Sequence, residues 1–272
     1  MDEITENILF ILYELCVKPS KFIEVYQKNS SDIKETVKYF NDSYKFEIKS
    51  LRQNINRKKS KTDILINYLI REKIDLINIS QQCYPQLLKQ IYLPPPLIFF
   101  KGEKIKKSRL NIAIVGTRKY TSYGRDAAIY LAGKLSDIGI TIVSGMAVGI
   151  DYYAQKEAVR HRGGSIGVLG SGINVVYPPE NEDLFKEIIF NGSIITEFFP
   201  DTPPSKNNFP ARNRIISGLC AGVIVIEAGE KSGALITSDF ALSQGREVFA
   251  VPGSIFNYES KGCNRLIKNG AK

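Results

Sequence analysis

The chain has 272 residues, of which 43% are hydrophobic and 24% charged, and its formal net charge is +9. This composition excludes wholesale disorder, and the length allows one large domain with a smaller one. The excess of Lys and Arg favours an anionic partner, because these cations replace the counterions around phosphates.

The first part of the chain has the apolar spacing of short amphipathic helices. The spacing predicts helices between residues 5 and 51. One apolar face holds Ile8, Leu9, Ile11, Leu12 and Leu15, and a second face holds Ile33, Val37 and Phe40. Residues 63–73 predict another helix. We therefore expect a small all-helical domain over residues 1–80, with a SAM-like fold as one candidate.

Most of the positive charge also lies early. Residues 1–110 hold 20 Lys and Arg against 13 Asp and Glu, whereas residues 111–272 hold 17 against 15. The densest basic run is 57–61, within a polar stretch over residues 54–61. We interpret it as a solvated linker or helix end rather than a phosphate contact. An anion site in the second part must then be a local cluster of cations and backbone amides.

A second domain is predicted for residues 81–272. Three prolines at 94–96 end the helical pattern and precede a short strand over 97–100. Apolar strands are then predicted at 111–115, 141–143, 165–169, 193–196, 222–226 and 247–250. Helices are predicted between them at 122–135, 150–159, 182–189, 212–219 and 234–242. This alternation predicts an α/β domain with a Rossmann-like, doubly wound and mostly parallel sheet.

Ligands of such sheets bind beyond the carboxyl ends of the strands. The first of these ends reads Gly116-Thr117-Arg118, where a glycine admits a phosphate and the arginine can grip it or stack on a base. A tight turn with a surface arginine explains this end equally well. Glycine-rich loops over 144–151 and 169–172 extend the edge into a phosphate-binding shelf. No dinucleotide fingerprint or Walker motif is present, so nicotinamide binding and triphosphate hydrolysis have no support.

The segment 207–219 adds cations to this edge. Pro210 is predicted to begin a helix whose first turn carries Arg212 and Arg214, with Lys206 just upstream. These cations favour an anion. For Arg214, an ion pair with Glu197 or Glu227 as a structural clamp is an equally good interpretation.

Other classes of site are disfavoured. The four cysteines form no Cys-x-x-Cys pair and His161 is the sole histidine, so we expect no zinc site and no other cofactor. No apolar run reaches the roughly 20 residues that span a bilayer, and no signal peptide is recognised. We expect a cytoplasmic protein without a membrane partner.

Six ordered blocks resemble the DprA/Smf family over residues 92–272. They lie at 115–118, 144–151, 168–181, 209–218, 232–237 and 249–254. The resemblance implies an extended Rossmann domain that binds single-stranded DNA. It also implies a homodimer that hands the strand to the RecA recombinase during natural transformation.

The same resemblance assigns residues. It implies that Arg118 and Lys206 contact DNA, in a pocket shaped by Gly116, Thr117, Ser144, Gly145, Gly170, Ser171, Arg212 and Asn213. Two positions depart from the family: Val148 stands where arginine is common, and Gln155 where histidine is common. These departures predict weaker DNA binding or a different set of contacts.

Two other functions remain open. Related Rossmann-like folds include phosphoribohydrolases, for which Glu227 and Asp239 are the candidate acid and base, but their Pro-Gly-Gly-x-Gly-Thr loop is absent here. A protein scaffold whose pocket holds a small nucleotide is the other alternative. We favour a binding protein without enzymatic activity.

Overall fold

The computed structural model describes residues 1–45, 60–103 and 109–272. They form two compact units, residues 1–84 with 93–99 and residues 85–92 with 100–272. Residues 57–59 of the basic run, and the end of the helical stretch predicted to residue 51, lie outside the described residues. The predicted domains 1–80 and 81–272 stay a prediction, because a compact unit need not fold on its own.

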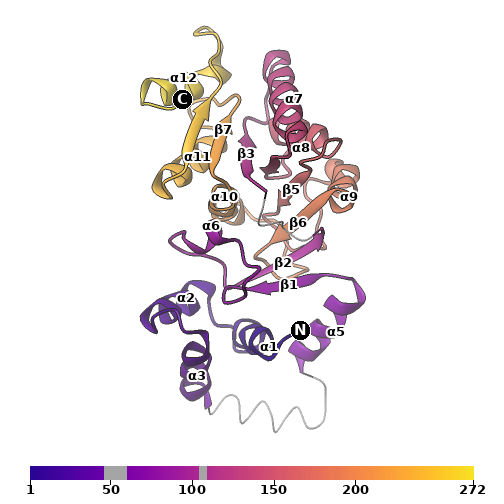
Figure 1. Cartoon of the computed structure of the whole chain (residues 1–272), viewed down its shortest axis with the longest axis vertical. Coiled ribbons are helices and arrows are strands. Elements are labelled where there is room, and N and C mark those ends of the chain that lie inside the picture. The colour runs from indigo at the N-terminus through magenta and orange to yellow at the C-terminus, as the bar shows by residue number, and fades with distance from the viewer. Residues whose placement is uncertain (46–59, 104–108) are drawn as a thin grey trace. The chain divides into compact units, whose positions relative to one another are not determined.

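The first unit is built mainly from short helices (Figure 1). Its elements are α1 (Glu3–Leu9), π-helix η1 (Phe10–Glu14), α2 (Pro19–Lys28), α3 (Ile33–Ser43), α5 (Lys61–Arg71) and strand β1 (Asp75–Asn78). Ile8, Leu9 and Ile11 are fully buried, as the predicted apolar face requires. The rings of Phe22 and Phe40 stack at 5.5 Å between α2 and α3. Strand β1 was not predicted, since four residues carry little periodic signal.

Six strands of the second unit form a parallel sheet. They are β3 (Asn111–Val115), β4 (Thr141–Ser144), β5 (Ser165–Val168), β6 (Gly192–Thr196), β7 (Gly222–Val225) and β8 (Glu247–Ala250). Their order is β6-β5-β4-β3-β7-β8, with every neighbouring pair parallel. Strand β2 (Leu97–Gly102) precedes them in the chain. The predicted parallel sheet is confirmed.

Helices follow the strands, and those between residues 122 and 243 match the predicted ones, whereas the helices over 86–89 and 261–268 were not predicted. They are α6 (Gln86–Lys89), α7 (Ser122–Asp137), α8 (Ile150–Ala158), α9 (Glu182–Phe190), α10 (Asn208–Gly218), α11 (Gly233–Ser243) and α12 (Lys261–Lys268), with short 3-10 turns η2 (Pro179–Asn181) and η3 (Tyr258–Ser260). In Figure 1, α7, α8 and α9 lie to the right of β3, and α11 and α12 to its left. Within the described parts of the chain, no helix is both long and apolar enough to cross a bilayer.

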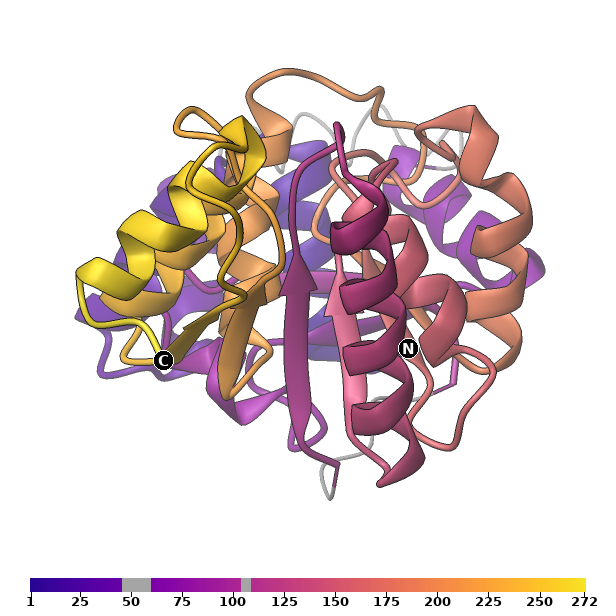
Figure 2. The ribbon, with the colours of Figure 1, turned by 90° about the horizontal axis from the view of Figure 1, so that it is seen from above.

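A core of small and branched residues joins α7 and α8 to the sheet. Ala128 and Ala132 of α7 and Ala154 of α8 are fully buried against Ile114 and Ile142 of the strands. Alanines let the two helices approach closely, and Figure 2 shows α7 lying alongside β3. His161 joins the C-terminal ends of the two helices. Its Nε2 lies 2.9 Å from a carboxylate oxygen of Glu157 in α8, and its Nδ1 lies 2.7 Å from one of Asp137 in α7.

The two hydrogen bonds of His161 should make the free energy of unfolding depend on pH. The hydrogen bond with Glu157, followed by that with Asp137, raises the pKa of His161 above 6.5. The folded state therefore holds the proton to a higher pH than the unfolded state. Its stabilisation is complete below the unfolded pKa and is lost as pH rises through the folded pKa. In urea titrations at increasing pH, from acidic to alkaline, the free energy of unfolding of the wild type should fall relative to that of His161→Gln. Parallel pH profiles of the two proteins would contradict the role assigned to the imidazolium.

Candidate nucleic-acid interface

The order of the sheet reverses between β3 and β7. From β3 the chain runs through α7 to β4, and from β7 it runs through α11 to β8 on the other side. Val115 and Val225 are paired in the register, so the two strands end level with each other. The loops that leave them diverge, and in open α/β sheets this divergence opens a crevice for ligands.

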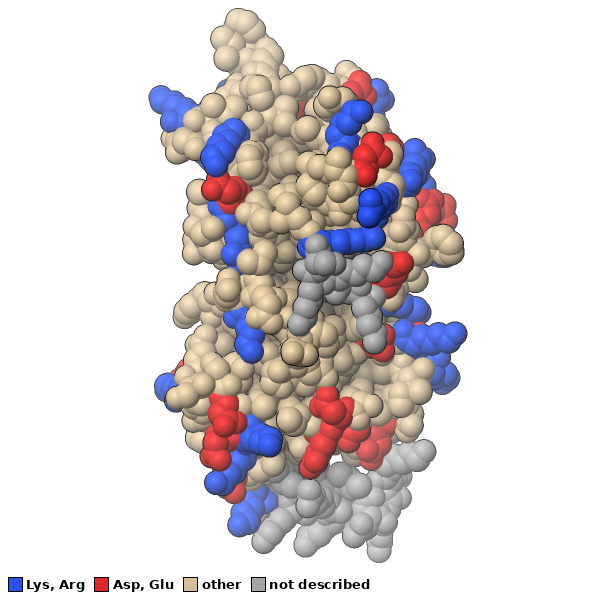
Figure 3. All heavy atoms as spheres, viewed as in Figure 1, with Lys and Arg blue, Asp and Glu red and all other residues tan. Residues whose placement is uncertain are grey.

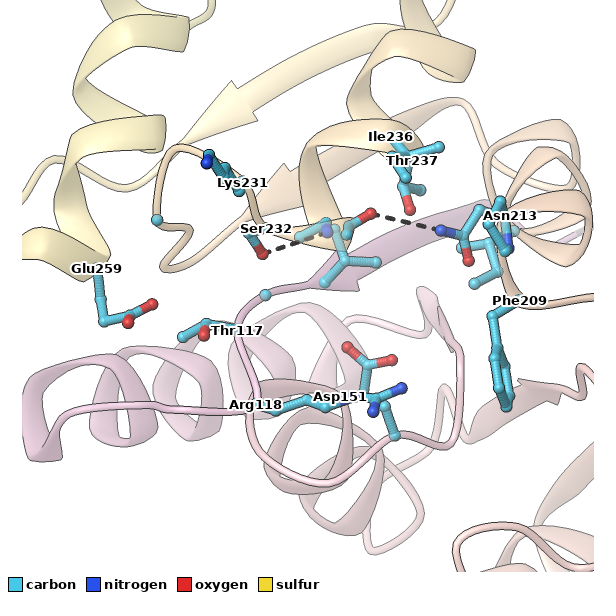
Figure 4. A pocket seen from close by; sticks show the side chains of 18 of the residues that line it. Thr117, Arg118, Asp151, Phe209, Asn213, Lys231, Ser232, Ile236, Thr237 and Glu259 are labelled. Carbon is cyan, nitrogen blue, oxygen red and sulfur yellow. Dashed lines mark hydrogen bonds between the residues drawn. The ribbon is translucent and has the colours of Figure 1, made fainter. Parts of the chain in front are cut away.

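A cavity of about 460 Å³ lies at this crevice. Its walls come from the loops after β3 and β7 and from the first turns of α8, α10 and α11. Figure 4 shows Thr117 and Arg118 on one side, Lys231 and Ser232 on another, and Phe209 and Asn213 from α10 on a third. Its volume falls within the roughly 300–1,000 Å³ typical of small-ligand sites.

The structure separates the predicted residues into two groups. Five of them line the cavity: Gly116, Thr117, Arg118, Arg212 and Asn213. Four others do not line the cavity: Ser144, which ends β4, Gly145 directly after it, and Gly170 and Ser171 in the loop after β5. Lys206 is exposed, two residues before α10, and it does not line the cavity either.

The loops behind the cavity hold its wall in place. The Ser144 hydroxyl donates to the Ile114 carbonyl at 2.6 Å, and the Ser171 hydroxyl donates to the Val175 carbonyl at 2.8 Å. A Cβ atom at Gly170 would lie 2.7 Å from the Phe209 ring. These residues therefore act through packing and internal hydrogen bonds.

Arg212 is the centre of this support. Its side chain is only 5% exposed, and its Nη1 donates to the carbonyls of Gly145, at 2.6 Å, and Val168. A Cβ atom at Gly145 would lie 2.6 Å from this guanidinium, so the loop needs a glycine there. Arg212 thus ties the loops after β4 and β5 to α10.

A buried carboxylate faces this arginine. Burial lowers the pKa of Arg212 to about 10, although Asp151 opposes the shift. Burial also raises the pKa of Asp151, while Arg212 and the backbone amide of Gly145 pull it down. Asp151 accepts that amide at 3.0 Å. Both titratable groups thus lie buried at the wall of the cavity, close enough for each to influence the pKa of the other.

Arg118 and Phe209 form a cationic and aromatic wall. The Arg118 guanidinium lies 5.9 Å from the centre of the Phe209 ring, within cation–π range. The centre of the Tyr177 ring lies 5.5 Å from the centre of the Phe209 ring, and the two ring planes are tilted by 32°. Arg118 is exposed, so its charge stays available to a phosphate while the rings offer stacking surface.

Asn213 completes the wall on the side of α11. Its side-chain amide donates to the Gly233 carbonyl at 3.4 Å, and its Oδ1 accepts from Arg212 Nε at 3.1 Å. Ser232 caps α11 by accepting from the Ala234 amide at 3.3 Å. Polar atoms of α10 and the beginning of α11 therefore border the same cavity.

Two glutamates have structural partners. Glu227 accepts the Thr121 amide at 2.9 Å and the Thr121 hydroxyl at 2.6 Å, so it holds the loop after β3. Arg214 pairs with Glu197 at 2.6 Å, which agrees with the clamp interpretation. Asp239 lines a different cavity, beside α12. The two carboxylates considered for acid and base chemistry thus do not meet at the crevice.

Comparison with known proteins identifies the family. A model of the DNA recombination-mediator protein A family matches residues 75–272. The chain belongs to this family. The DprA protein of Bacillus subtilis is 46% identical over 73% of this chain and 67% of its own length. The Streptococcus pneumoniae protein is 42% identical over 74% of this chain and 71% of its own length.

Solved structures of the recombination-mediator family share the fold. The crystal structure of DprA from Streptococcus pneumoniae superposes with a TM-score of 0.79 at 34% identity, over 98% of this chain and 94% of that one. DprA from Helicobacter pylori, described for its single-stranded DNA binding mode, gives 0.68 at 31% identity, over 74% and 90%. Membership and fold agree with the predicted resemblance.

The two departures from the family pattern have different surroundings in this structure. Gln155 is fully buried; its Oε1 accepts the Met146 amide at 3.0 Å, and its Nε2 donates to Ser165 and Ile166. It shapes the loop after β4 from within. Val148 is 37% exposed and follows Ala147, a lining residue. Of the two, only Val148 is exposed, next to a residue that lines the cavity.

Sequence reasoning missed several lining residues of this family member. Lys231, Tyr258 and Glu259 border the cavity. Lys231 directly precedes the helix start at Ser232, which is a readable signal. Glu259 reaches the site from η3, where its carbonyl accepts the Ala228 amide at 2.7 Å, and no local pattern announces that contact.

Charge on the molecular surface is mixed. On the face drawn in Figure 3, the Lys and Arg side chains are interspersed with Asp and Glu rather than gathered into one patch. Long-range attraction by a uniform basic surface therefore has no support on this face. Any anion bound near the crevice would therefore depend on the local cations, such as Arg118 and Lys231.

A side chain at Gly149 should strain the loop that carries Arg118. It has φ +91°, and a Cβ atom there would lie 2.5 Å from the Thr117 carbonyl oxygen and 2.8 Å from Arg118 Cα. Gly149→Ala should cost about 1–3 kcal/mol of unfolding free energy and displace the loop that carries Arg118. Urea denaturation measures the first effect.

Gly139 provides a matched control for this substitution. It has φ +90° with nothing within 4 Å of its added Cβ, so Gly139→Ala reports the backbone cost alone. A loss no larger for Gly149→Ala than for Gly139→Ala would show that the approach to Thr117 and Arg118 does not constrain the loop.

Proposed function

We propose that the chain binds single-stranded DNA at the crevice beyond β3 and β7. The observation that carries this proposal is the wall in which exposed Arg118 lies 5.9 Å from the Phe209 ring, at the edge of the cavity. A guanidinium and an aromatic face suit the two parts of a nucleotide, the phosphate and the base. Single strands expose their bases for stacking, whereas a duplex does not.

Lys206 extends this site in the proposal. Its ammonium is exposed near the start of α10, the helix that carries Phe209 and Asn213. A second cation along the same strand path can contact a neighbouring phosphate without lining the cavity. Gly145 and Gly170 then act indirectly, because they pack against Arg212 and Phe209. Ser144 and Ser171 act through their hydrogen bonds to the Ile114 and Val175 carbonyls.

The family and its structures support this assignment. The Helicobacter pylori relative, described for its binding of single-stranded DNA, shares the fold at 31% identity. We propose further that the chain acts in the cytoplasm as a homodimer that protects incoming strands and loads RecA in natural transformation. Family membership supports these steps. A binding role without catalysis is also favoured, because the Glu227 carboxylate already holds Thr121.

A titration of the wild-type protein tests the proposal. Fluorescence anisotropy with labelled single-stranded and double-stranded oligonucleotides, each at low and high salt, should show a strong preference for the single strand. The logarithm of affinity should fall with the logarithm of salt at a slope of about −0.7 per phosphate contact. Equal affinity for both forms, or a flat salt response with mononucleotide binding alone, would overturn it.

A further inference from the structure

Three tyrosines gather beside the crevice and have no place in the site described so far. Tyr120 lies in the loop between β3 and α7, and Tyr152 and Tyr153 lie in the first turn of α8. The rings of Tyr120 and Tyr153 are 4.9 Å apart at 73°, and those of Tyr152 and Tyr153 are 5.3 Å apart at 84°. We call these three residues the tyrosine ledge.

The ledge is anchored at one end and exposed at the other. Tyr153 packs against the core of α7 and α8, and its hydroxyl is 2.7 Å from that of Tyr120. Tyr120 itself is 39% exposed. In an edge-to-face pair, only one ring face is covered by the partner, so the arrangement leaves aromatic faces free. An anchored ring with free surface is suited to stacking.

The ledge adjoins the cavity through the backbone. Arg118 lines the cavity, and Tyr120 follows it by two residues. The Ile150 amide donates to the Thr117 carbonyl at 3.3 Å, which fastens the start of α8 to the same loop. A strand that leaves the cavity past Arg118 therefore meets Tyr120 next.

Cations accompany the aromatic rings. Arg118 and Lys119 are exposed immediately before Tyr120. The hydrogen bond with Tyr120, followed by burial, raises the pKa of Tyr153. Arg125, in the first turn of α7, is close enough for its positive charge to oppose this rise. Asp126 neutralises part of that charge at 2.8 Å. Exposed cations beside aromatic rings can contact the phosphates and the bases of a single strand.

We propose that the tyrosine ledge stacks the bases of a single strand just outside the cavity, as a second contact surface for the same strand. This inference rests on the proposed function of the cavity. The ledge adds affinity for strands that extend beyond the pocket, and it does so for any base sequence because every base has a flat face.

Affinity and cross-linking test the ledge together. In anisotropy titrations with a labelled oligothymidine long enough to reach past the cavity, Tyr120→Ala should weaken binding roughly tenfold, as for the loss of one stacked base. Tyr120→Phe keeps the ring and should bind as the wild type does. With bromodeoxyuridine oligonucleotides, ultraviolet cross-links in the wild type should map to peptides that contain Tyr120 or Tyr152 and Tyr153.

Tyr130 offers a matched control, since it is 64% exposed on α7 but outside the ledge. Tyr130→Ala should leave affinity unchanged. The proposed role of the ledge would be overturned by wild-type affinity in Tyr120→Ala or by cross-links confined to other peptides. Loss of a dimer in place of lost DNA binding would overturn it too. None of these results would contradict binding at the cavity. A wild-type protein that binds no single strand would instead overturn the proposed function.

Discussion

Arg212→Met is expected to remove about 3–5 kcal/mol of the free energy of unfolding, because it leaves two buried carbonyls without their donor and a buried carboxyl without a nearby opposite charge. The substitution leaves Asp151 buried without its opposing charge. It also removes the donor to the carbonyls of Gly145 and Val168. Urea denaturation at neutral pH measures the loss, and single-strand binding should fall with it because the loops after β4 and β5 lose their tie to α10.

Asn213→Ala is the control for this effect. Asn213 is the next residue of α10 and lines the same cavity, but its longest hydrogen bond, to Gly233, is 3.4 Å. The substitution also removes the acceptor of Arg212 Nε, so the loss should stay at about 2 kcal/mol, with about 1 kcal/mol for each of the two hydrogen bonds. If Arg212→Met cost no more than Asn213→Ala, the buried guanidinium would not be the support that the geometry indicates.

Arg118→Ala combined with Lys206→Ala should produce the largest loss of DNA affinity without loss of stability. Both side chains are exposed, so their removal leaves no buried group unpaired. If each contacts one phosphate, the salt slope should become shallower by about 1.4. We expect at least a roughly tenfold loss of affinity for single strands at low salt, measured by anisotropy.

The basic run provides a control with the same residue types. Arg57→Ala combined with Lys61→Ala removes one arginine and one lysine, and therefore the same net charge. Its effect on affinity should be small if the crevice, rather than overall charge, binds the strand. Equal losses in the two double variants would instead show that net charge governs binding.

Much of the fold was predictable because its signals are local. The apolar strands at 111–115 and 222–226 and the glycine-bounded loops between strands and helices predicted the parallel sheet that the structure shows. Helix ends were less certain. We placed the start of a helix at Pro210, whereas α10 begins at Asn208, because proline is tolerated anywhere in a first turn.

The candidate site was predictable only in part. Motif spacing brought Arg118, Arg212 and Asn213 to one edge of the sheet, and all three line the cavity. Their roles depend on burial, which the sequence does not reveal: Arg212 supports loops from inside, while Arg118 stays exposed. Glu259 arrives from a segment far along the chain, so its presence could be seen only in three dimensions.

A crystal structure of the protein with a short oligothymidine would show directly whether the crevice binds the strand. We expect one nucleotide in the cavity, with its base against Phe209 and its phosphate within contact distance of Arg118. A strand bound to another surface, with the cavity beyond β3 and β7 empty, would contradict it.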